Sequence, residues 1–391
     1  MIIEPAEAHL AGVAGVRRHG RPVVEPERIP RVMEHLEAVG RLAIRDGLHR
    51  CGWHHGERLP RRDLTARLGV AHRHAGLLRS WLSALMSAGM LEETGGSLGW
   101  RGKAPSPDFN VSAPSELEWA YADLGFPPIM ARVHGRALES LPDLIRDMLS
   151  IEQVLFADGR VLQALAAYQD NLFTTYLNSA CAHLARRLAE SRSTRSLKIV
   201  ELGGGAGLTS ASVLRELHGI EVDYLFSDLS RLFTVAARDR FSARPGMRYG
   251  LLDINTAFTT QDVAADSVDL VVAGNVLHNA RDLRATLAHI RQVLAPGGWL
   301  LFTESCRDNH AVLTCMQFLL SPASGAAAPG WSDRRGVSGS PFLNLTGWRD
   351  TLRQAGFAPL LILPETASPL AAAGQYLFLA RVDDDMDMGA V

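Results

Sequence analysis

The sequence has few cysteines and no long apolar run. Four cysteines are spread through its 391 residues, and none forms a C-x-x-C pair. This spacing excludes a disulfide-rich scaffold and a cysteine-based zinc module, and it suits a reducing compartment. No stretch approaches the roughly 18 uninterrupted apolar residues of a membrane span, and the N-terminus lacks the charge pattern of a signal peptide. We therefore expect a cytoplasmic protein without a membrane segment.

Lysine is nearly absent, and neither sign of charge is in excess. The 40 cationic residues include only Lys103 and Lys198 as lysines, and 42 acidic residues leave a net charge of −2. This balance lacks the basic excess that holds a nucleic-acid backbone, so a nucleic-acid partner is not expected. Apolar residues make up 47% of the chain, which excludes a disordered protein. The length fits two or three domains of about 100–200 residues.

The first half of the chain has helical patterns. Residues 1–25 show no clear period and are expected to be irregular, whereas apolar residues recur at helical spacing from 29 to 50. A helix–turn–helix pattern and a glycine-centred hairpin follow, which together predict a winged helix over residues 1–105. Its second helix carries a buried-type stripe instead of a polar face that could read DNA bases, and this favours dimerisation over a DNA-binding regulator. The stripe comprises Leu77, Leu78, Trp81, Leu82, Leu85 and Met86.

The second half of the chain alternates between apolar strands and amphipathic helices. This pattern predicts an α/β, Rossmann-like domain over residues 196–382, with a parallel sheet covered on both faces. Between the two halves, prolines and serines gather from 104 to 114, and residues 116–190 have helical patterns throughout. We therefore expect a helical region that covers the substrate over residues 106–195, and an acidic tail over 383–391.

A glycine-rich turn follows the first strand of the α/β domain. It contains Glu201, Gly203, Gly205 and Gly207, and the last glycine of a dinucleotide-binding G-x-G-x-x-G pattern would fall on Leu208. No Lys-Ser/Thr pair follows, so a phosphate-binding loop is excluded as well. An acid before three glycines at alternate positions is typical of S-adenosylmethionine-dependent methyltransferases. Bare backbone in this turn lets the amino-acid end of the cofactor approach closely.

Two further acids end the next strands. Asp228 is placed where a carboxylate can accept both ribose hydroxyls, and Asp253 is placed to hold the adenine amino group. Their neighbours Leu229 and Ile254 are predicted for the same cofactor site, as is Asn275 after the fourth strand.

Several segments resemble the C-methyltransferase domains of polyketide and nonribosomal peptide synthases, and also their free-standing relatives in bacterial secondary metabolism. The segments are LPDLIRDMLSIEQVLFADG, AYQDNLFTTYLN, FSDLSRLF, NVLHNARD and LAPGGWLLFTES, within about residues 140–380. The resemblance implies S-adenosylmethionine as cofactor and a small aromatic substrate. The predicted winged helix resembles the dimerisation domain of small-molecule methyltransferases, which implies a homodimer. No carrier-protein domain is evident, so a free substrate is favoured over a tethered one.

The same resemblance implies a catalytic dyad of His278 and Glu304. The histidine follows the fourth strand as general base, and a carboxylate on one ring nitrogen leaves the other free to take a proton. Tyr168 and Asn178 match the family pattern beside the cofactor. Trp331 and Arg335 match a Trp-x-Asp-x-Arg stretch, in which the arginine either clamps a substrate carboxylate or forms a surface ion pair.

Three alternatives stay open. The same base could serve O-methylation of a phenol, since deprotonated oxygen is also a nucleophile. An α-keto acid could be the substrate, with an iron bound by His278 and either His310 or a nearby Asp, although no metal-binding motif is present and no metal is expected. The winged helix could bind DNA.

Overall fold

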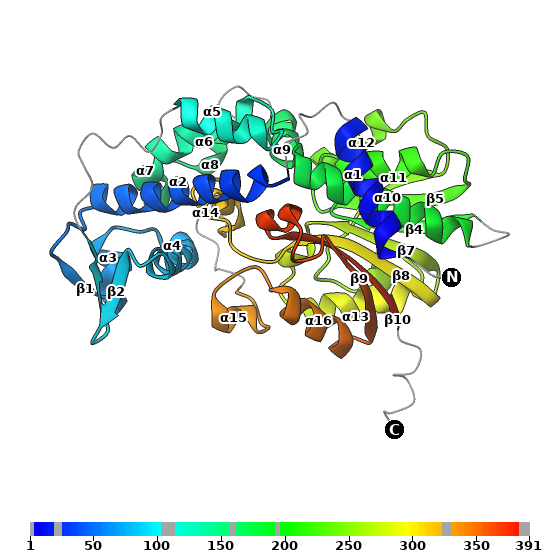
Figure 1. Ribbon diagram of the computed structural model, residues 1–391. Coiled ribbons are helices and arrows are strands. Elements are labelled where there is room, and N and C mark those ends of the chain that lie inside the picture. The colour runs from blue at the N-terminus through cyan, green and yellow to red at the C-terminus, as the bar shows by residue number, and fades with distance from the viewer. Residues whose placement is uncertain are drawn as a thin grey trace.

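The computed structural model describes residues 4–18, 26–102, 114–155, 161–191, 196–322 and 330–382. The predicted acidic tail and all of the predicted linker except residue 114 lie outside these ranges. The chain forms a helical part and an α/β part, which lie side by side in Figure 1. No helix in the described ranges is long and apolar enough to cross a membrane.

The α/β part contains a seven-stranded sheet with the order β6-β5-β4-β7-β8-β10-β9. All pairs from β6 to β8 are parallel, whereas β10 runs antiparallel to both β8 and β9. The predicted Rossmann-like fold is therefore confirmed, with an antiparallel pair added at one edge. The strands are β4 (Leu197–Leu202), β5 (Val222–Asp228), β6 (Met247–Leu251), β7 (Val268–Gly274), β8 (Leu294–Ser305), β9 (Phe357–Leu363) and β10 (Gln375–Val382).

Helices cover both faces of this sheet. Side chains of α10 (Leu172–Glu190), α11 (Leu208–Glu216) and α12 (Arg231–Arg240) share a core with one face. Those of α13 (Leu283–Val293) and α16 (Leu345–Gln354) share a second core with the other face. Covering on both faces explains why the strands are apolar almost throughout. Because β4, β5, β7 and β8 are parallel, the loops that follow them meet at one edge.

The helical part is built around a long helix, α2 (Arg28–Arg50), that packs with the chain up to residue 173 and with residues 311–318 in a third core. The predicted hairpin is present as β2 and β3, and β1 pairs with the other edge of β3 to complete a small antiparallel sheet. The other elements are β1 (Arg58–Pro60), α3 (Leu64–Arg67), α4 (Ala75–Ser87), β2 (Leu91–Thr94), β3 (Ser97–Trp100), α5 (Pro114–Asp123), α6 (Ile129–Glu139), α7 (Leu141–Ile145), α8 (Ile151–Leu155) and α9 (Val161–Gln169).

The apolar stripe of α4 is buried inside this chain. Its leucines and Trp81 pack in the same core as α2 and residues 311–318. The indole N–H of Trp81 donates to the carbonyl oxygen of Leu313, 3.0 Å away, at the end of α14 (His310–Leu313). The stripe therefore serves intramolecular packing and no longer supports a dimer interface. The homodimer stays a prediction without this argument.

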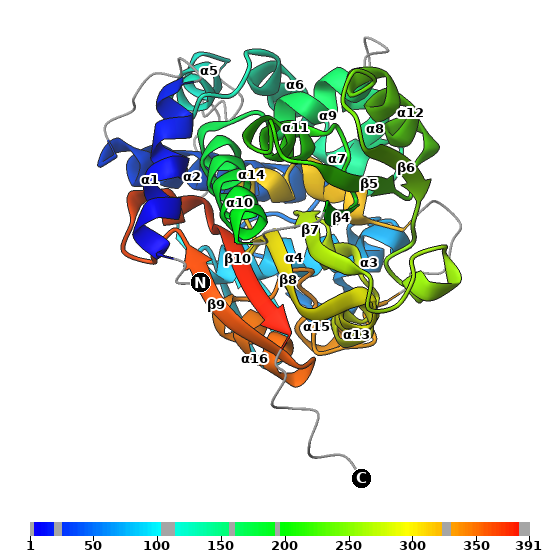
Figure 2. The same ribbon diagram turned by 90° about the vertical axis from the view of Figure 1, so that its right-hand side faces the viewer.

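The N-terminal segment is a helix, so the predicted irregular lead-in is wrong for its described part. Helix α1 (Pro5–Arg18) lies along α10, as Figure 2 shows. A Cβ atom at Gly12 or Gly15 would collide with Tyr176 or Ser179 of α10. These glycines let the two backbones approach closely, and this contact depends on small residues more than on an apolar stripe. A search for apolar periodicity therefore misses the helix.

Candidate active site

A cavity of about 560 Å³ lies between the loops at the carboxyl edge of the sheet and the helical part. The sheet side is lined by residues that follow β4, β5, β6 and β7. The helical side is lined by α2, α5, α9 and residues 309–320. Predicted site residues that line it are Tyr168, Gly203, Gly205, Asp228, Leu229, Asp253, Ile254, Asn275 and His278.

The glycine turn gives this cavity a bare backbone wall. Gly203 has a φ of +60°, and a Cβ there would collide with Val276. Gly205 has a φ of +52°, but a Cβ there would meet no atom closer than Gln169 Nε2 at 3.9 Å. Since Gln169 also lines the cavity, the space beside Gly205 is open to a ligand. This is the close approach that the amino-acid end of S-adenosylmethionine requires, so the turn fits the cofactor. Gly207 is the N-cap residue just before α11 and faces Phe241 instead.

Asp228 is tied to this turn. Its Oδ2 accepts from the backbone N–H of Gly205 (3.0 Å), and its Oδ1 accepts from that of Ser230 (2.8 Å). Burial raises the pKa of the carboxyl group, while these backbone hydrogen bonds act in the opposite direction. The next residue, Leu229, is 72% exposed and lines the cavity. A carboxylate beside an unusually exposed apolar side chain suits a ribose next to a flat base.

Glu201 lies behind the cavity. Its Oε2 accepts from Ser210 Oγ (2.5 Å) and Tyr224 Oη (2.9 Å), and Oε1 is buried without a hydrogen-bond partner in the described part of the chain. Burial raises the pKa of this carboxyl group to about 7. Asn178 accepts from Thr209 Oγ1 and lines the same small recess as Glu201, adjoining the glycine turn. Both predicted residues therefore sit behind the glycine turn, outside the wall of the main cavity.

His278 and Glu304 are in direct contact. The Oε1 of Glu304 accepts from the backbone N–H of His278 (3.1 Å), and its Oε2 lies 3.0 Å from the imidazole Nδ1. The parallel pairing of β7 with β8 brings the two together, since each follows or ends its strand. The carboxylate is 1% exposed. A buried carboxylate accepts, so Nδ1 carries the proton and Nε2 is left to accept one.

Arg335 is a structural residue, and the prediction that it contacts the substrate is wrong. Its guanidinium is 0% exposed and does not line the cavity. It donates to Asp333 and to the carbonyl oxygens of His278 (2.8 Å) and Ala280 (2.7 Å). The arginine thus supports the backbone of the dyad from behind. Trp331 stacks against this arginine and also lies outside the cavity wall.

His310 does not accompany His278 in the cavity. Its Nδ1 contacts Glu37 Oε2 at 2.7 Å, in a group that joins α2 to the segment after β8. The arrangement of two histidines that the iron-assisted alternative invokes is therefore absent from the described cavity wall.

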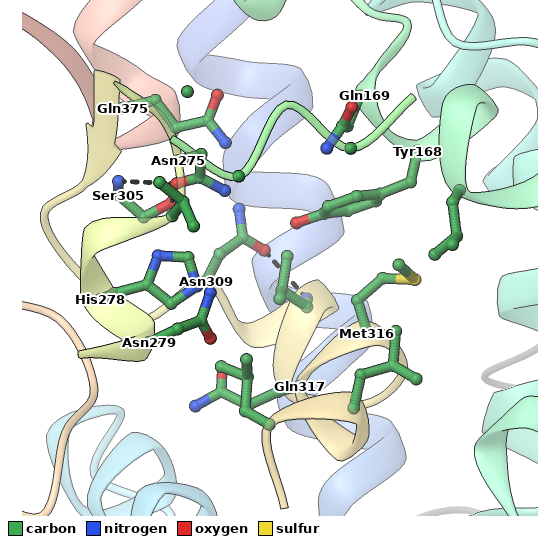
Figure 3. Close-up of a pocket in the computed structure, with 18 of the residues that line it drawn as sticks. Tyr168, Gln169, Asn275, His278, Asn279, Ser305, Asn309, Met316, Gln317 and Gln375 are labelled. Carbon is green, nitrogen blue, oxygen red and sulfur yellow. Dashed lines mark hydrogen bonds between the residues drawn. The ribbon is translucent and has the colours of Figure 1, made fainter. Parts of the chain in front are cut away.

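Several polar residues of the cavity were not predicted from the sequence. Asn279 and Ser305 adjoin the dyad residues, so proximity in sequence could have indicated them. No sequence signal places the remaining four. All six unpredicted residues are shown in Figure 3: Gln169, Asn279, Ser305, Asn309, Gln317 and Gln375. The hydroxyl of Tyr168 points into the cavity among them, and burial raises its pKa to about 12.

Comparison with known proteins identifies the domain that carries this site. Residues 200–300 match a family model described as a methyltransferase domain. Residues 200–300 form a methyltransferase domain. The prediction of a methyltransferase is confirmed at the level of domain and fold. The trans-methyltransferase CalH, which aligns with a TM-score of 0.57 at 19% identity and covers 90% of both chains, is described as a complex with SAH, in agreement with the predicted cofactor.

Two solved structures share nearly the whole fold with this methyltransferase. The CurJ carbon methyltransferase aligns with a TM-score of 0.82 at 23% identity, covering 97% of this chain and 100% of that one. The DszA carbon methyltransferase aligns with a TM-score of 0.77 at 24% identity, covering 97% of both. Because the coverage includes residues before 196, the helical part belongs to the shared fold.

Sequence relatives of this chain include large synthases. Pyochelin synthetase PchF of Pseudomonas aeruginosa is 30% identical over 332 residues, covering 82% of this chain and 18% of that protein. Polyketide synthase ThaG of Burkholderia thailandensis is 32% identical over 345 residues, covering 83% of this chain and 6% of that protein. The chain thus spans less than a fifth of the length of these relatives. The predicted resemblance to methyltransferase domains of such synthases is confirmed.

Proposed function

We propose that this protein transfers a methyl group from S-adenosylmethionine to a carbon atom of a small aromatic metabolite in secondary metabolism. His278 is the general base and Glu304 orients it. The observation that carries this proposal is the contact of Glu304 with both the backbone N–H and Nδ1 of His278, on a cavity that also contains the glycine turn.

The cofactor-binding residues have distinct roles in this proposal. The turn from Gly203 to Gly205 holds the amino-acid end, and Asp228 accepts hydrogen bonds from the ribose hydroxyls. Leu229, Asp253 and Ile254 surround the adenine. Tyr168 and Asn275 close the cavity from opposite sides, while Glu201 and Asn178 support the turn from behind. When bound, S-adenosylmethionine supplies a methyl group already activated by its sulfonium charge.

The protein's own task is to generate and aim the nucleophile. His278 Nε2 takes a proton from a carbon next to a carbonyl group, or from a phenol whose ring carbon then attacks. The electron pair left on the substrate forms the new carbon–carbon bond while the methyl–sulfur bond of the donor breaks and its electron pair stays on sulfur. On the phenol route, the proton of the attacked ring carbon then moves to the oxygen, which restores the aromatic ring. The negative charge of Glu304 stabilises the imidazolium that results, and its two hydrogen bonds fix the ring tautomer. The proton leaves His278 to solvent after the transfer.

The lining of the cavity supports an aromatic substrate. Phe342 lies with its ring centroid 5.3 Å from that of His278, and apolar side chains line the helical side. Flat rings pack well between such groups. These apolar residues are Met33, Leu36, Tyr121, Leu124, Phe126 and Met316.

A second candidate substrate is an acyl chain of polyketide type. The likeness in fold to the CurJ and DszA carbon methyltransferases favours it, as do the polyketide synthases among the relatives. The α-carbon of a β-ketoacyl group is acidic enough for a histidine base, so the same dyad would serve. The predicted O-methylation is a third outcome of the experiment below.

The test is to identify the product and the atom that receives the methyl group. Purified protein is incubated with S-adenosylmethionine carrying an isotopically labelled methyl group. The substrate panel is tyrosine, hydroxykynurenine, hydroxyanthranilate, phenylpyruvate and an acetoacetyl thioester. Mass spectrometry detects methylation, and NMR assigns the methyl group to carbon or oxygen. A carbon-methylated aromatic product supports the proposal. Methylation of the thioester alone supports the second candidate, and an oxygen-bound methyl group or no product with any compound overturns the proposal.

A further inference from the structure

Asn309 presents a fixed hydrogen-bond donor to the cavity. Its Oδ1 accepts from the backbone N–H groups of Ala311 (3.0 Å) and Val312 (3.2 Å), so it caps the start of α14. The oxygen is thereby committed, and the amide nitrogen must face the other way. Figure 3 shows this nitrogen pointing into the cavity, on the side away from the cap. The helix cap therefore sets the direction of a donor that no step of the mechanism above uses.

Gln317 presents a hydrogen-bond acceptor to the same cavity. It lies in the 3₁₀ turn Met316–Leu320, lines the cavity and is 5% exposed. Its side chain hydrogen-bonds to Asp308, whose pKa is raised by burial and lowered by this bond. Because this hydrogen bond lowers the pKa, it favours the ionised carboxylate, which only accepts; the Gln317 amide nitrogen is then the donor and Oε1 is left over. This oxygen is buried and has no hydrogen-bond partner within the described ranges.

An orphaned buried acceptor is costly, because it has lost its hydrogen bonds to water and gained none in the protein. A substrate donor would remove that cost on binding. Asn309 and Gln317 also lie on the segment that follows Glu304, so one stretch of chain carries both amides and the carboxylate of the dyad. Figure 3 shows Gln317 and Asn309 among the side chains that line the same cavity as His278 and Asn279.

We propose that Asn309 and Gln317 form a substrate subsite that recognises one hydrogen-bond acceptor and one hydrogen-bond donor of the substrate. The Asn309 amide donates to the carbonyl oxygen next to the reacting carbon, which becomes an enolate oxygen when His278 takes the proton. The Gln317 Oε1 accepts from a hydroxyl or N–H group elsewhere on the substrate. The substrate class is therefore a small carbonyl compound that also carries a hydroxyl or amino group. This inference rests on the proposed function.

The donor is tested with Asn309→Asp. Aspartate caps a helix as well as asparagine does, but it has no N–H and places a negative charge beside the enolate. Loss of one oxyanion donor lowers kcat by about 10²–10³-fold, so we expect a loss of this size with KM changed less. Phenylpyruvate should also bind more weakly, by about tenfold or more. The matched control is Asn344→Asp, which caps α16 through Gly347 N–H outside the cavity and should change neither quantity.

The acceptor is tested with Gln317→Met, which keeps the length of the side chain and removes its polar atoms. Calorimetry with S-adenosylhomocysteine-saturated protein compares para-hydroxyphenylpyruvate with phenylpyruvate, which differ by one hydroxyl. The intact protein should bind the hydroxylated compound about tenfold more tightly, and Gln317→Met should lose this preference. Gln354→Met, on the exposed side of α16, should keep it.

The outcomes separate the subsite from the proposed function. A hydroxyl preference that Gln317→Met abolishes, without methylated product from any compound, contradicts the proposed function and supports the subsite. Methylated product together with equal binding of the two compounds, or a preference that survives in Gln317→Met, overturns the subsite alone. No binding of either compound also overturns the subsite.

Discussion

The two walls of the cavity are built differently. On the sheet side, the lining at 203–206, 228–229, 252–255 and 274–278 lies at or just after the ends of parallel strands, so the topology brings Gly205, Asp228 and His278 to one edge. On the helical side, the lining comes from α2, α5 and residues 309–320, which are far apart in the sequence and meet through long-range packing. The residues proposed for the reaction therefore come from the ends of individual strands, whereas the residues proposed to select the substrate depend on how distant segments pack.

The largest effect is expected on the sheet side, from His278→Ala. Removing a general base lowers turnover by about 10²–10⁴-fold, while affinity for S-adenosylmethionine should stay nearly unchanged because the glycine turn and Asp228 are intact. Steady-state kinetics and calorimetry measure the two quantities. The exposed His218 on the loop after α11 offers the control His218→Ala, which should match the parent. A parallel loss of cofactor affinity in His278→Ala would assign the histidine to cofactor binding instead.

On the helical side, the main effect of a substitution is expected to be a loss of unfolding free energy. Trp81→Ala removes a fully buried ring and its hydrogen bond to Leu313, and large-to-small changes of this kind cost about 3–5 kcal/mol of unfolding free energy. Because Trp81 packs within its own chain, the oligomeric state should not change. Urea unfolding and light scattering measure the two properties. Trp119→Ala, at a ring that is 43% exposed on α5, should cost far less. Dissociation of an oligomer by Trp81→Ala would restore α4 as an interface.

Asp228→Ala tests whether the sheet side also binds the cofactor, separately from the catalytic role proposed for His278. The carboxylate holds Gly205 and Ser230 and is proposed to bind the ribose, so its loss should weaken S-adenosylmethionine binding by about 1–3 kcal/mol. Calorimetry measures this change, and Asp239→Ala on the exposed side of α12 is the control. Unchanged affinity in a folded Asp228→Ala protein would contradict the cofactor assignment.

A smaller effect is expected from a substitution of Glu201. Burial raises the pKa of its carboxyl group to about 7, from a usual value of 4.5. The folded state holds this proton more tightly than the unfolded state, so the contribution to stability is complete below about pH 4.5 and is lost as the pH rises toward 7. Glu201→Gln should therefore raise the melting temperature above neutral pH relative to the parent and have little effect in acid. Thermal unfolding across this range measures the change. An equal shift at every pH would show that ionisation of the buried carboxyl group is not its cause.

The sequence predicts the sheet side well because its signals are local. The acid and glycines from Glu201 to Gly207, and the acids at 228 and 253, each mark the end of a strand, and the strand order then brings them together. Arg335 shows the limit of this approach. A motif gives its position, but the direction of a guanidinium depends on partners such as the carbonyl oxygens of His278 and Ala280.

The helical side could be predicted only as helices. The stripe on α4 has the spacing of a buried face, but periodicity does not distinguish burial within a chain from burial between chains. Asn309 and Gln317 could not be found, because no local pattern places residues 309–317 over a cavity lined by α2 and α5. Their role depends on long-range packing of α14 against α2 and α4.

The most direct test of the dyad is a double-mutant cycle in turnover. The members are His278→Ala, Glu304→Gln and the double variant, each compared with the parent under the same cofactor concentration. If Glu304 acts by orienting and stabilising the imidazole, it has no further effect once the imidazole is gone, so the double variant should be little slower than His278→Ala. Losses that simply add would show that the two residues do not act as a base and its partner.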